Sequence, residues 1–475
     1  MKLTLQVMTS TDDGQQIVQE ILVLEREGLH PDTVGLTLAE SKTLLRTLQE
    51  VMVAHQVQEF VDTHRQCSQC GRAYHHKDSR SIPVRTLFGK VPIESPRFYH
   101  CSCQPCDQRT FSPVVAQLPA RTTPELLYLE TKFASLLSYG ISTELLKDTL
   151  PVDEKLNPIT LRNHLLRVAQ RTEDALGEER SSFIDGCPRD WGRLPAPDGP
   201  LTVGIDGGYV RAPHKEGWFE VITGKSIPSF MREDTHELPP SKCFGFVRTF
   251  DTKPKRRLFE LLKSQGMQMN QQMTFLTDGG ESVRDVQEFL NPEAEHWLDW
   301  FHITMRLTVL GQYSKGVEKQ NSALAVKAEK ALTRIKHYLW HGNVFQALQT
   351  IDGLEGDVEN IEDPTDVIRK LQKGVSELQT YLENNRAYIP NFGERYRNGD
   401  TISTAFVEST VNQVISKRFV KKQSMQWTQR GAHLLLQTRT RVLNGDLEST
   451  FREWYPHFRP QETKIIDFCP ISHTF

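Results

Sequence analysis

The sequence predicts a multidomain protein of the α/β class, and three observations support this prediction. Two apolar segments of the strand type end in Asp-Gly-Gly, around residues 206 and 278. Apolar residues recur at helical spacing in the segments 123–180, 307–388 and 405–442. Five cysteines gather between residues 67 and 106. Strands, long helices and a metal-type cysteine cluster within one chain indicate several modules with different architectures.

Composition limits the classes of protein that fit. The chain has 475 residues, of which 38% are hydrophobic and 25% are charged, as in ordinary globular proteins. This length suggests about three domains. The net charge of -3 is not strongly basic, so any nucleic-acid surface must be a local patch. We find neither a signal peptide nor an apolar run of about 18 residues, and we therefore expect a cytoplasmic or nucleoid location without a membrane partner.

The N-terminal part is expected to hold three domains. They are a helical segment (1–64), a zinc-ribbon-like module (65–119) and a helical domain (120–186). The first is predicted from apolar residues at helical spacing, such as Ile17, Ile21, Leu44 and Leu48, and we interpret it as a packing or oligomerisation segment. In the third, Pro124 marks a helix start. The pattern that follows fits a helix-turn-helix and a plain helical bundle equally well.

The cysteine cluster predicts a structural zinc site. Cys67 and Cys70 form one Cys-x-x-Cys pair, and Cys103 and Cys106 form a second, which together offer four thiolates for tetrahedral zinc. Cys101 is an alternative ligand, and the histidines at positions 75, 76 and 100 are others. Zinc would fold a segment that has little core of its own. Reduced cysteines without metal remain the alternative.

Two aspartates are placed where an α/β sheet presents its ligands. The predicted strands are 201–205, 218–222, 244–250, 273–276 and 297–303. Asp206 follows the first of them and Asp278 the fourth, and two glycines come after each aspartate. Ligands gather at such strand ends, and Mg²⁺ prefers carboxylate oxygens. The alternative is that each Asp-Gly pair only forms a turn.

Glu408 is the candidate for a third carboxylate. Val407, Val411, Val414 and Ile415 form one apolar helix face, so that Glu408 lies beside a face that should pack on the sheet. Basic residues follow, and they predict either a phosphate-binding surface or an ordinary solvated face. The candidates for contacts with DNA are Lys417, Arg418, Lys421, Lys422 and Arg430.

The chain resembles the ISKra group of bacterial insertion-sequence transposases. The resemblance is carried by FVESTVNQ (406–413), KRFVKKQ (417–423), QW (426–427), RGAH (430–433) and LQ (436–437), by HWLDWFH (296–302) and by both Asp-Gly-Gly segments. It covers residues 200–445 well, the cysteine-rich part loosely and the first 60 residues hardly at all.

The resemblance implies a fold and a reaction. The fold is an RNase H-like catalytic domain (198–306 and 389–445) with a helical insertion (307–388), followed by a C-terminal tail (446–475). Asp206, Asp278 and Glu408 would be the Asp-Asp-Glu triad that holds Mg²⁺ or Mn²⁺ for DNA cleavage and strand transfer. The partners would be the terminal inverted repeats of the element and target DNA, with the protein acting as a homo-oligomer on paired DNA ends.

Two further expectations accompany the resemblance. Asp299 and His302 have the spacing of a [Cys/Asp]-x-x-His motif that follows the second aspartate in related transposases, so His302 is a candidate near the active site. The alternative is a hydrogen-bonded core histidine. At the level of function, the alternatives are an RNase H-like nuclease without strand transfer and a non-catalytic DNA-binding protein derived from a transposase.

Overall fold

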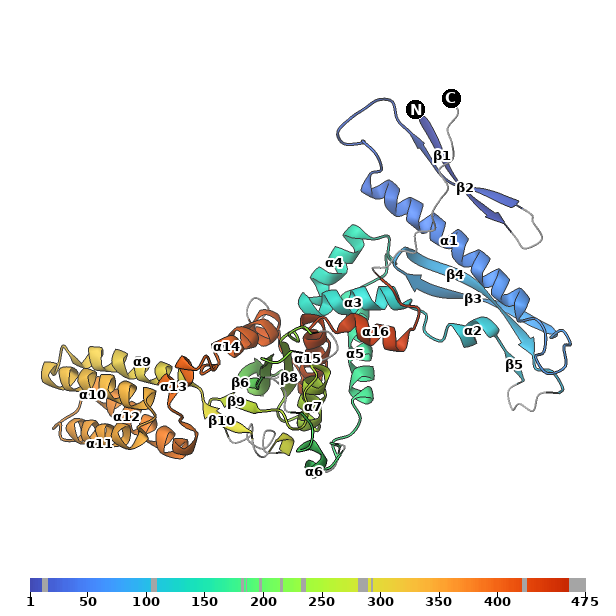
Figure 1. The fold of residues 1–475 in the computed structure, drawn as a ribbon. Coiled ribbons are helices and arrows are strands. Elements are labelled where there is room, and N and C mark those ends of the chain that lie inside the picture. The colour runs from blue at the N-terminus through green and yellow to red at the C-terminus, as the bar shows by residue number, and fades with distance from the viewer. Residues whose placement is uncertain are drawn as a thin grey trace. The chain divides into compact units, whose positions relative to one another are not determined.

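The computed structural model is a mixed α/β protein with several sheets and many helices (Figure 1). It describes residues 1–10, 16–103, 109–180, 183–184, 186–195, 199–213, 217–231, 236–280, 289–291, 294–420 and 425–460. The chain divides into two units, Met1–Val168 with Gly445–Phe475, and Ala169–Asn444. Among the described residues, no helix is both long and apolar enough to cross a membrane.

The first unit begins with a β-hairpin and a long helix. Strands β1 (Lys2–Ser10) and β2 (Gln16–Glu25) pair antiparallel, and α1 (Leu38–Thr63) follows (Figure 1). Thr37 and Glu40 form a reciprocal capping box that fixes the start of α1. The expected all-helical segment 1–64 is therefore wrong for β1 and β2. Ile17 and Ile21 are four residues apart, and this spacing fits one face of a strand as well as one face of a helix.

The rest of the first unit consists of a small sheet and short helices. The antiparallel sheet contains β3 (His76–Thr86), β4 (Gly89–Tyr99) and β5 (Thr110–Phe111). The helices are α2 (Pro113–Gln117), α3 (Pro124–Leu136), α4 (Tyr139–Thr149), α16 (Leu447–Trp454) and the first part of α5 (Pro158–Ala175), which continues into the second unit from Ala169. The expected C-terminal tail thus contains a helix, whose Phe451 packs edge-on against Tyr128 of α3. The helices α3 to α5 lie where the helical domain 120–186 was predicted.

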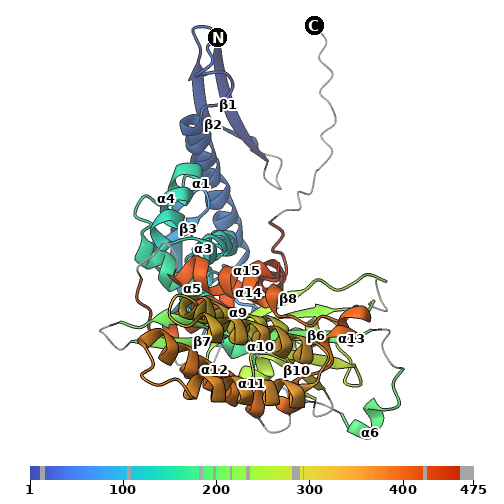
Figure 2. The same cartoon turned by 90° about the vertical axis from the view of Figure 1, so that its left-hand side faces the viewer.

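The second unit contains a five-stranded mixed sheet in the order β10-β9-β6-β7-β8. Figures 1 and 2 show strands of this sheet with helices around them. Its strands are β6 (Leu201–Arg211), β7 (Trp218–Pro228), β8 (Lys242–Val247), β9 (Met273–Thr277) and β10 (Glu295–Leu298). The strand β7 pairs antiparallel with both β6 and β8. The strand β9 pairs parallel with β6, and β10 pairs parallel with β9. Four of the five predicted strands are present at their expected places. The fifth is too long, because β10 ends at Leu298 and a helix begins at Trp300. The expectation that Asp206 follows the end of its strand is wrong, however, because β6 continues through Asp206 to Arg211.

Helices cover both faces of this sheet. On one face, Leu258 and Leu262 of α7 (Pro254–Ser264) share a core with Val203 and Ile205 of β6. The helix α14 (Ala405–Val411), the π-helix η2 (Asn412–Val420) and α15 (Gln429–Leu443) also contact the sheet. The unit further contains the short helices α6 (Pro188–Trp191) and α13 (Phe392–Arg397). The helix α6 lies inside the segment 187–200 that reads as a linker in sequence.

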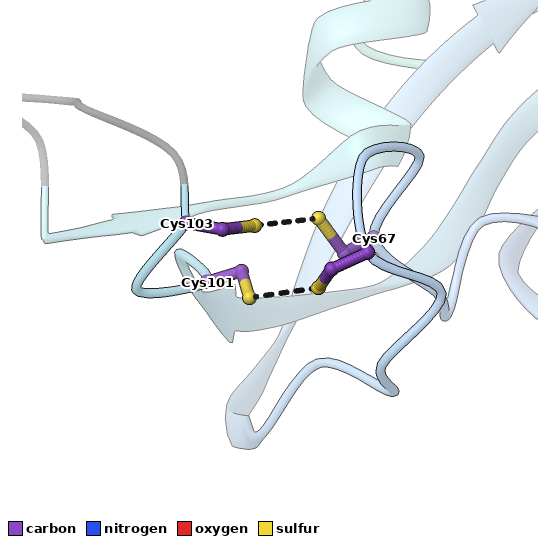
Figure 3. A group of neighbouring side chains, drawn as sticks. Cys67, Cys101 and Cys103 are labelled. Carbon is purple, nitrogen blue, oxygen red and sulfur yellow. Dashed lines mark hydrogen bonds between the residues drawn. The ribbon is translucent and has the colours of Figure 1, made fainter.

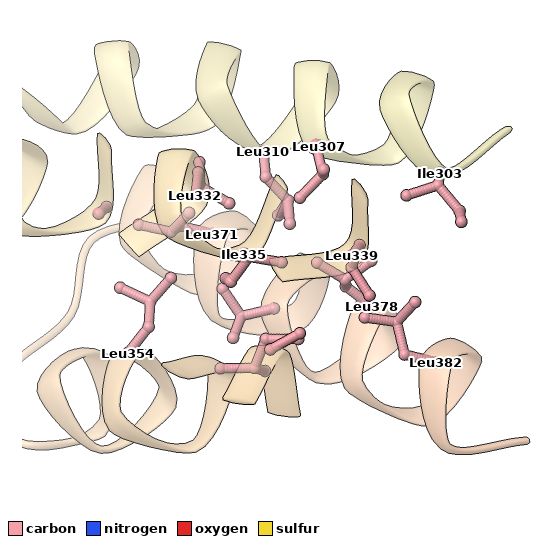
Figure 4. Close-up of a cluster of buried hydrophobic side chains, with 14 of the residues drawn as sticks. Ile303, Leu307, Leu310, Leu332, Ile335, Leu339, Leu354, Leu371, Leu378 and Leu382 are labelled. Carbon is pink, nitrogen blue, oxygen red and sulfur yellow. The ribbon is translucent and has the colours of Figure 1, made fainter. Parts of the chain in front are cut away.

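A four-helix bundle is inserted between β10 and α13. Its helices are α9 (Trp300–Val317), α10 (Ser322–Trp340), α11 (Val344–Glu359) and α12 (Asp366–Asn384), and the short helix η1 (Arg386–Tyr388) follows. Figure 4 shows its core, in which leucines such as Leu310, Leu339 and Leu378 point inward from different helices. The helical periodicity predicted for residues 307–388 is confirmed, because a helix buries residues at intervals of three and four.

Candidate functional site

Asp206 and Asp278 lie at neighbouring positions of the sheet. The parallel register pairs Gly204 of β6 with Leu276 of β9, and each aspartate comes two residues later along its strand direction. Neighbouring strands are about 4.8 Å apart, so this register brings the two aspartates side by side. Asp206 is half-buried and Asp278 is exposed. Asp206 therefore lies within β6, partly covered by its surroundings, whereas Asp278 lies just after the end of β9.

The electrostatics of Asp206 reflect this proximity. Burial raises the pKa of Asp206, and the negative charges of Asp278 and Asp299 raise it further. A hydrogen bond of 2.7 Å from the backbone N–H of Gly207, together with the charge of His302, only partly offsets these effects. Two carboxylates that repel each other offer hard oxygen donors to a divalent cation such as Mg²⁺, which would relieve the repulsion. The donor set thus fits the predicted metal.

His302 joins this cluster through Asp299. His302 lies in the first turn of α9 and shares a hydrogen bond of 2.7 Å with the buried carboxylate of Asp299, the N-cap residue of that helix. Burial alone would lower the pKa of His302, but the bond to Asp299 and the charges of Asp206 and Asp278 outweigh it and raise the pKa. Burial also favours a higher pKa for Asp299, yet its hydrogen bonds with His302 and Thr404 lower it. Each of the two groups therefore favours the charged form of the other.

The same carboxylate fixes the start of α14, the helix that carries Glu408. Asp299 accepts a hydrogen bond of 2.8 Å from the backbone N–H of Thr404 and another from its hydroxyl group. Thr404 is the N-cap residue of α14, but its own side chain caps no N–H of that helix. Asp299 thus links the two helix starts that hold His302 and Glu408.

Glycines in β6 let α14 and η2 approach the sheet closely. Gly204, Asp206 and Gly208 alternate along β6 and therefore face the same side. A Cβ atom at Gly204 would lie 2.3 Å from Cγ2 of Val407, and one at Gly208 would lie 2.8 Å from Cδ1 of Ile415. The helix segment with Glu408 consequently covers the face to which Asp206 points.

Of the three predicted carboxylates, Glu408 is not shown in contact with the other two. Glu408 follows Val407 directly and its side chain is exposed. The described groups of three or more candidate ligands whose ligand atoms all lie within 4.8 Å of one another do not include Asp206, Asp278 and Glu408. The structure therefore brings Asp206, Asp278 and His302 into electrostatic contact and places Glu408 on the adjoining helix.

The predicted basic surface is only partly basic. Lys417 and Arg430 are exposed, whereas Lys421 and Lys422 lie outside the described residues. Arg418 has no exposed surface, and its guanidinium lies over the ring of Trp427, 5.2 Å from the centroid. The prediction that Arg418 contacts DNA directly is therefore wrong, because its side chain is buried. Arg418 lies eleven residues, or about three helical turns, after Val407 and therefore on the buried face of the helix. The apolar repeat in the sequence already indicated this face.

The helical insertion contributes side chains that the sequence did not suggest. The hydroxyl group of Tyr381 in α12 donates a hydrogen bond of 3.1 Å to the backbone carbonyl of Asp278. Gly279 has a positive φ of 95°, and a Cβ atom there would lie 2.5 Å from Oδ1 of Asn385. The turn that carries Asp278 is thus braced by the end of α12. Only the two glycines after Asp278 gave a sequence signal for this close approach.

Four cysteines of the first unit form a separate candidate metal centre. The ligand atoms of Cys67, Cys70, Cys101 and Cys103 all lie within 4.8 Å of one another (Figure 3). The Sγ atoms of Cys67 and Cys103 are 3.5 Å apart, and those of Cys70 and Cys101 are 3.4 Å apart. Thiolates around zinc, with Zn–S bonds of about 2.3 Å, lie roughly 3.8 Å apart, so this set fits a structural zinc ion.

Cys101 therefore takes part in the cluster, although the sequence offered it only as an alternative ligand. Cys106, which was paired with Cys103 in that prediction, lies outside the described residues. The backbone N–H groups of Cys70 and Gln69 help to lower the pKa of Cys67 to about 6, because they stabilise its thiolate. A thiolate at neutral pH is the form that binds zinc.

A third cluster has a structural explanation. Glu173, Asp251 and His433 lie close enough to hold a cation, but Arg257 already occupies that role. Its guanidinium donates to Glu173 at 2.8 Å and to Asp251 at 2.9 Å. Burial would raise the pKa of Glu173, but His433 and Arg257 outweigh it and lower the pKa to about 2. The cluster is thus a buried ion network that ties α7 and α15 to the end of α5.

Comparison of the chain with models of known protein families and with curated proteins finds no match.

Proposed function

We propose that this chain is a DNA transposase that cleaves the ends of an insertion sequence and joins them to target DNA. The observation that carries the proposal is the strand register that sets Asp206 beside Asp278, under the helix that bears Glu408. Asp206, Asp278 and Glu408 would act as an Asp-Asp-Glu triad. If the two Asp-Gly pairs only formed turns, the packing of a helix with a third acidic residue against the glycines of β6 would have no explanation.

The sheet supports an RNase H-like catalytic domain. Three consecutive antiparallel strands, followed by two strands parallel to the first, give the order β10-β9-β6-β7-β8. The four-helix bundle α9–α12 would be the helical insertion between the second and third carboxylates. Ligands of such sheets bind near the carboxyl ends of the parallel strands. Asp278 follows the end of β9, and Asp206 lies beside it within β6.

Each candidate residue has a defined task. Asp206, Asp278 and Glu408 would hold two Mg²⁺ or Mn²⁺ ions, which activate the attacking hydroxyl group and stabilise the leaving oxygen when bound. His302, whose protonated form is favoured by Asp299, would offer a hydrogen-bond donor near the phosphate. In-line displacement requires mainly such positioning and charge stabilisation from the protein.

The remaining modules would bind DNA and organise the complex. Lys417 and Arg430 offer exposed cations next to α14 and α15, and Lys421 and Lys422 stand between them in sequence. The cysteine cluster would fold a zinc-ribbon-like module, and α3 to α5 would form a helix-turn-helix. We infer from the resemblance that the protein acts near the nucleoid, as a homo-oligomer on terminal inverted repeats.

A strand-transfer assay distinguishes the candidate functions. Labelled DNA that carries both ends of the element is incubated with the full chain, target plasmid and Mg²⁺ or Mn²⁺. A transposase yields cleaved ends and joined products, and Asp206→Asn yields neither. Cleaved ends without joined products would instead indicate an RNase H-like nuclease. Binding without cleavage would indicate a non-catalytic DNA-binding protein derived from a transposase.

A further inference from the structure

An arginine of the helical insertion lies against Tyr381, which braces the turn of Asp278, and has no carboxylate partner of its own in the described part of the chain. Arg306 stands one helical turn after His302 on α9, and its side chain is exposed. The guanidinium carbon lies 4.0 Å from the centroid of the Tyr381 ring. Among the described residues, Arg306 hydrogen-bonds to the hydroxyl group of Tyr381 but takes part in no ion pair within 4.0 Å. Its positive charge is thus available to a ligand.

Tyr381 connects this arginine to the second aspartate. The ring of Tyr381 supports Arg306, while its hydroxyl group donates to the backbone carbonyl of Asp278 at 3.1 Å. Asn385, one turn later on α12, donates to the carbonyl of Tyr381 at 2.9 Å and packs on Gly279. Tyr381 therefore contacts both Arg306 of α9 and Asp278 after β9, and it fixes the position of the arginine relative to the aspartate.

We propose that Arg306 binds the phosphate of the DNA strand that is cleaved, and that Tyr381 is the positioning residue that orients it. The inference rests on the proposed function, because it assigns the substrate contact of that same site. A guanidinium presents a planar fork of donors that matches two phosphate oxygens, and stacking on an aromatic face restricts its orientation. A phosphodiester is the ligand that suits both the free cation and the adjacent metal-binding carboxylates.

The geometry also explains why an insertion is built into the sheet domain. The residues Arg306 and Tyr381 belong to α9 and α12, whose packing is set by the leucine core of the bundle. A side chain on such a helix is held more precisely than one on a loop. The bundle therefore positions the phosphate-binding cation relative to Asp278.

The test measures single-turnover cleavage at saturating DNA. We expect Arg306→Ala to lower the cleavage rate constant about 100-fold, as for the loss of one oriented donor to a reacting group. Arg306→Lys keeps the charge but not the fork, and should lose less. Tyr381→Phe keeps the ring under Arg306 and loses the hydrogen bonds of the hydroxyl group to Asp278 and Arg306, so it should be milder than Tyr381→Leu. Lys315→Ala is the control, because this exposed cation lies about 13.5 Å further along the same helix.

A second measurement separates a phosphate contact from a structural role. Each protein is tested on DNA whose scissile phosphate is replaced by a neutral methylphosphonate. If Arg306 pairs with that phosphate, the penalty of the neutral substrate is smaller in Arg306→Ala and in Tyr381→Leu than in the wild type. Equal penalties in all three proteins would overturn the inference.

The outcomes also distinguish this inference from the proposed function. A wild-type protein that does not cleave DNA contradicts the proposed function and removes the basis of the inference. A wild-type protein that cleaves, with Arg306→Ala and Lys315→Ala cleaving at the same rate, contradicts the inference alone. Because Arg306 is exposed, its replacement should leave the fold intact, which circular dichroism checks.

Discussion

The buried carboxylate of Asp299 accepts a hydrogen bond of 2.8 Å from the backbone N–H of Thr404, although 105 residues separate them. The same carboxylate shares a hydrogen bond of 2.7 Å with His302. The helical insertion lies between Asp299 and Thr404 in sequence, so this contact joins the two ends of the insertion. It fixes α14 relative to α9, and with it Glu408 relative to His302.

The replacement Asp299→Asn should uncouple His302 from the site. The partner carboxylate raises the pKa of His302 above its ordinary value of 6.5, so the variant should titrate at a lower pH. Because the folded pKa is raised, the pairing stabilises the protein below about pH 6.5 and this contribution is lost as the pH rises through the folded value. Nuclear magnetic resonance titration of His302 measures the change. An unchanged pKa, as expected for the control Asp366→Asn, would argue against the pairing.

Gly204→Ala should lift α14 from the sheet. The new Cβ atom would meet Cγ2 of Val407 at 2.3 Å, and such overpacking costs about 1–3 kcal/mol. Urea unfolding should show that loss, and DNA cleavage should fall because Glu408 is displaced. Gly353→Ala is the matched control, since a Cβ atom there meets nothing within 4 Å. Equal stability of the two variants would contradict the seating of α14.

Much of the site could be predicted from local sequence patterns, but the contacts between residues far apart in sequence could not. The strands that carry or precede Asp206 and Asp278 were predictable, because short apolar runs give their own signal. The continuation of β6 through Asp206 and its two glycines to Arg211 was not predicted. Thr404 and Tyr381 carry none, since each meets its partner across more than one hundred residues. Arg418 was misjudged for a different reason. Its charge suggested the surface, whereas its place in the apolar repeat predicted burial.

Cys101→Ser should release zinc from the first unit. Its Sγ atom lies 3.4 Å from that of Cys70, so the variant leaves only three of the four described thiols. Elemental analysis of the purified chain should show loss of zinc for Cys101→Ser and for Cys67→Ser. The exposed Cys187 lies outside the cluster, and Cys187→Ser should keep the metal. Full zinc content in Cys101→Ser, with loss in Cys106→Ser, would restore the ligand set first expected from the sequence.

Arg257→Met should destabilise the second unit. It leaves the carboxylates of Glu173 and Asp251 without their buried cation, which costs about 3–5 kcal/mol. In the wild type, the pKa of Glu173 is lowered from 4.5 to about 2, so its stabilising effect is present above about pH 4.5 and is lost as the pH falls toward 2. Urea unfolding at several pH values measures both effects. The exposed pair of Arg180 and Glu178 provides the control, because Arg180→Met should change little.

The most direct test of the account is the affinity of the DNA-bound protein for Mn²⁺, measured by electron paramagnetic resonance. If Asp206, Asp278 and Glu408 share the metal ions, then Asp206→Asn, Asp278→Asn and Glu408→Gln each weaken Mn²⁺ binding at least about ten-fold, which corresponds to about 1.4 kcal/mol. Binding by Glu408→Gln that equals the wild type would contradict the account, because the helix seated on β6 would then contribute no ligand.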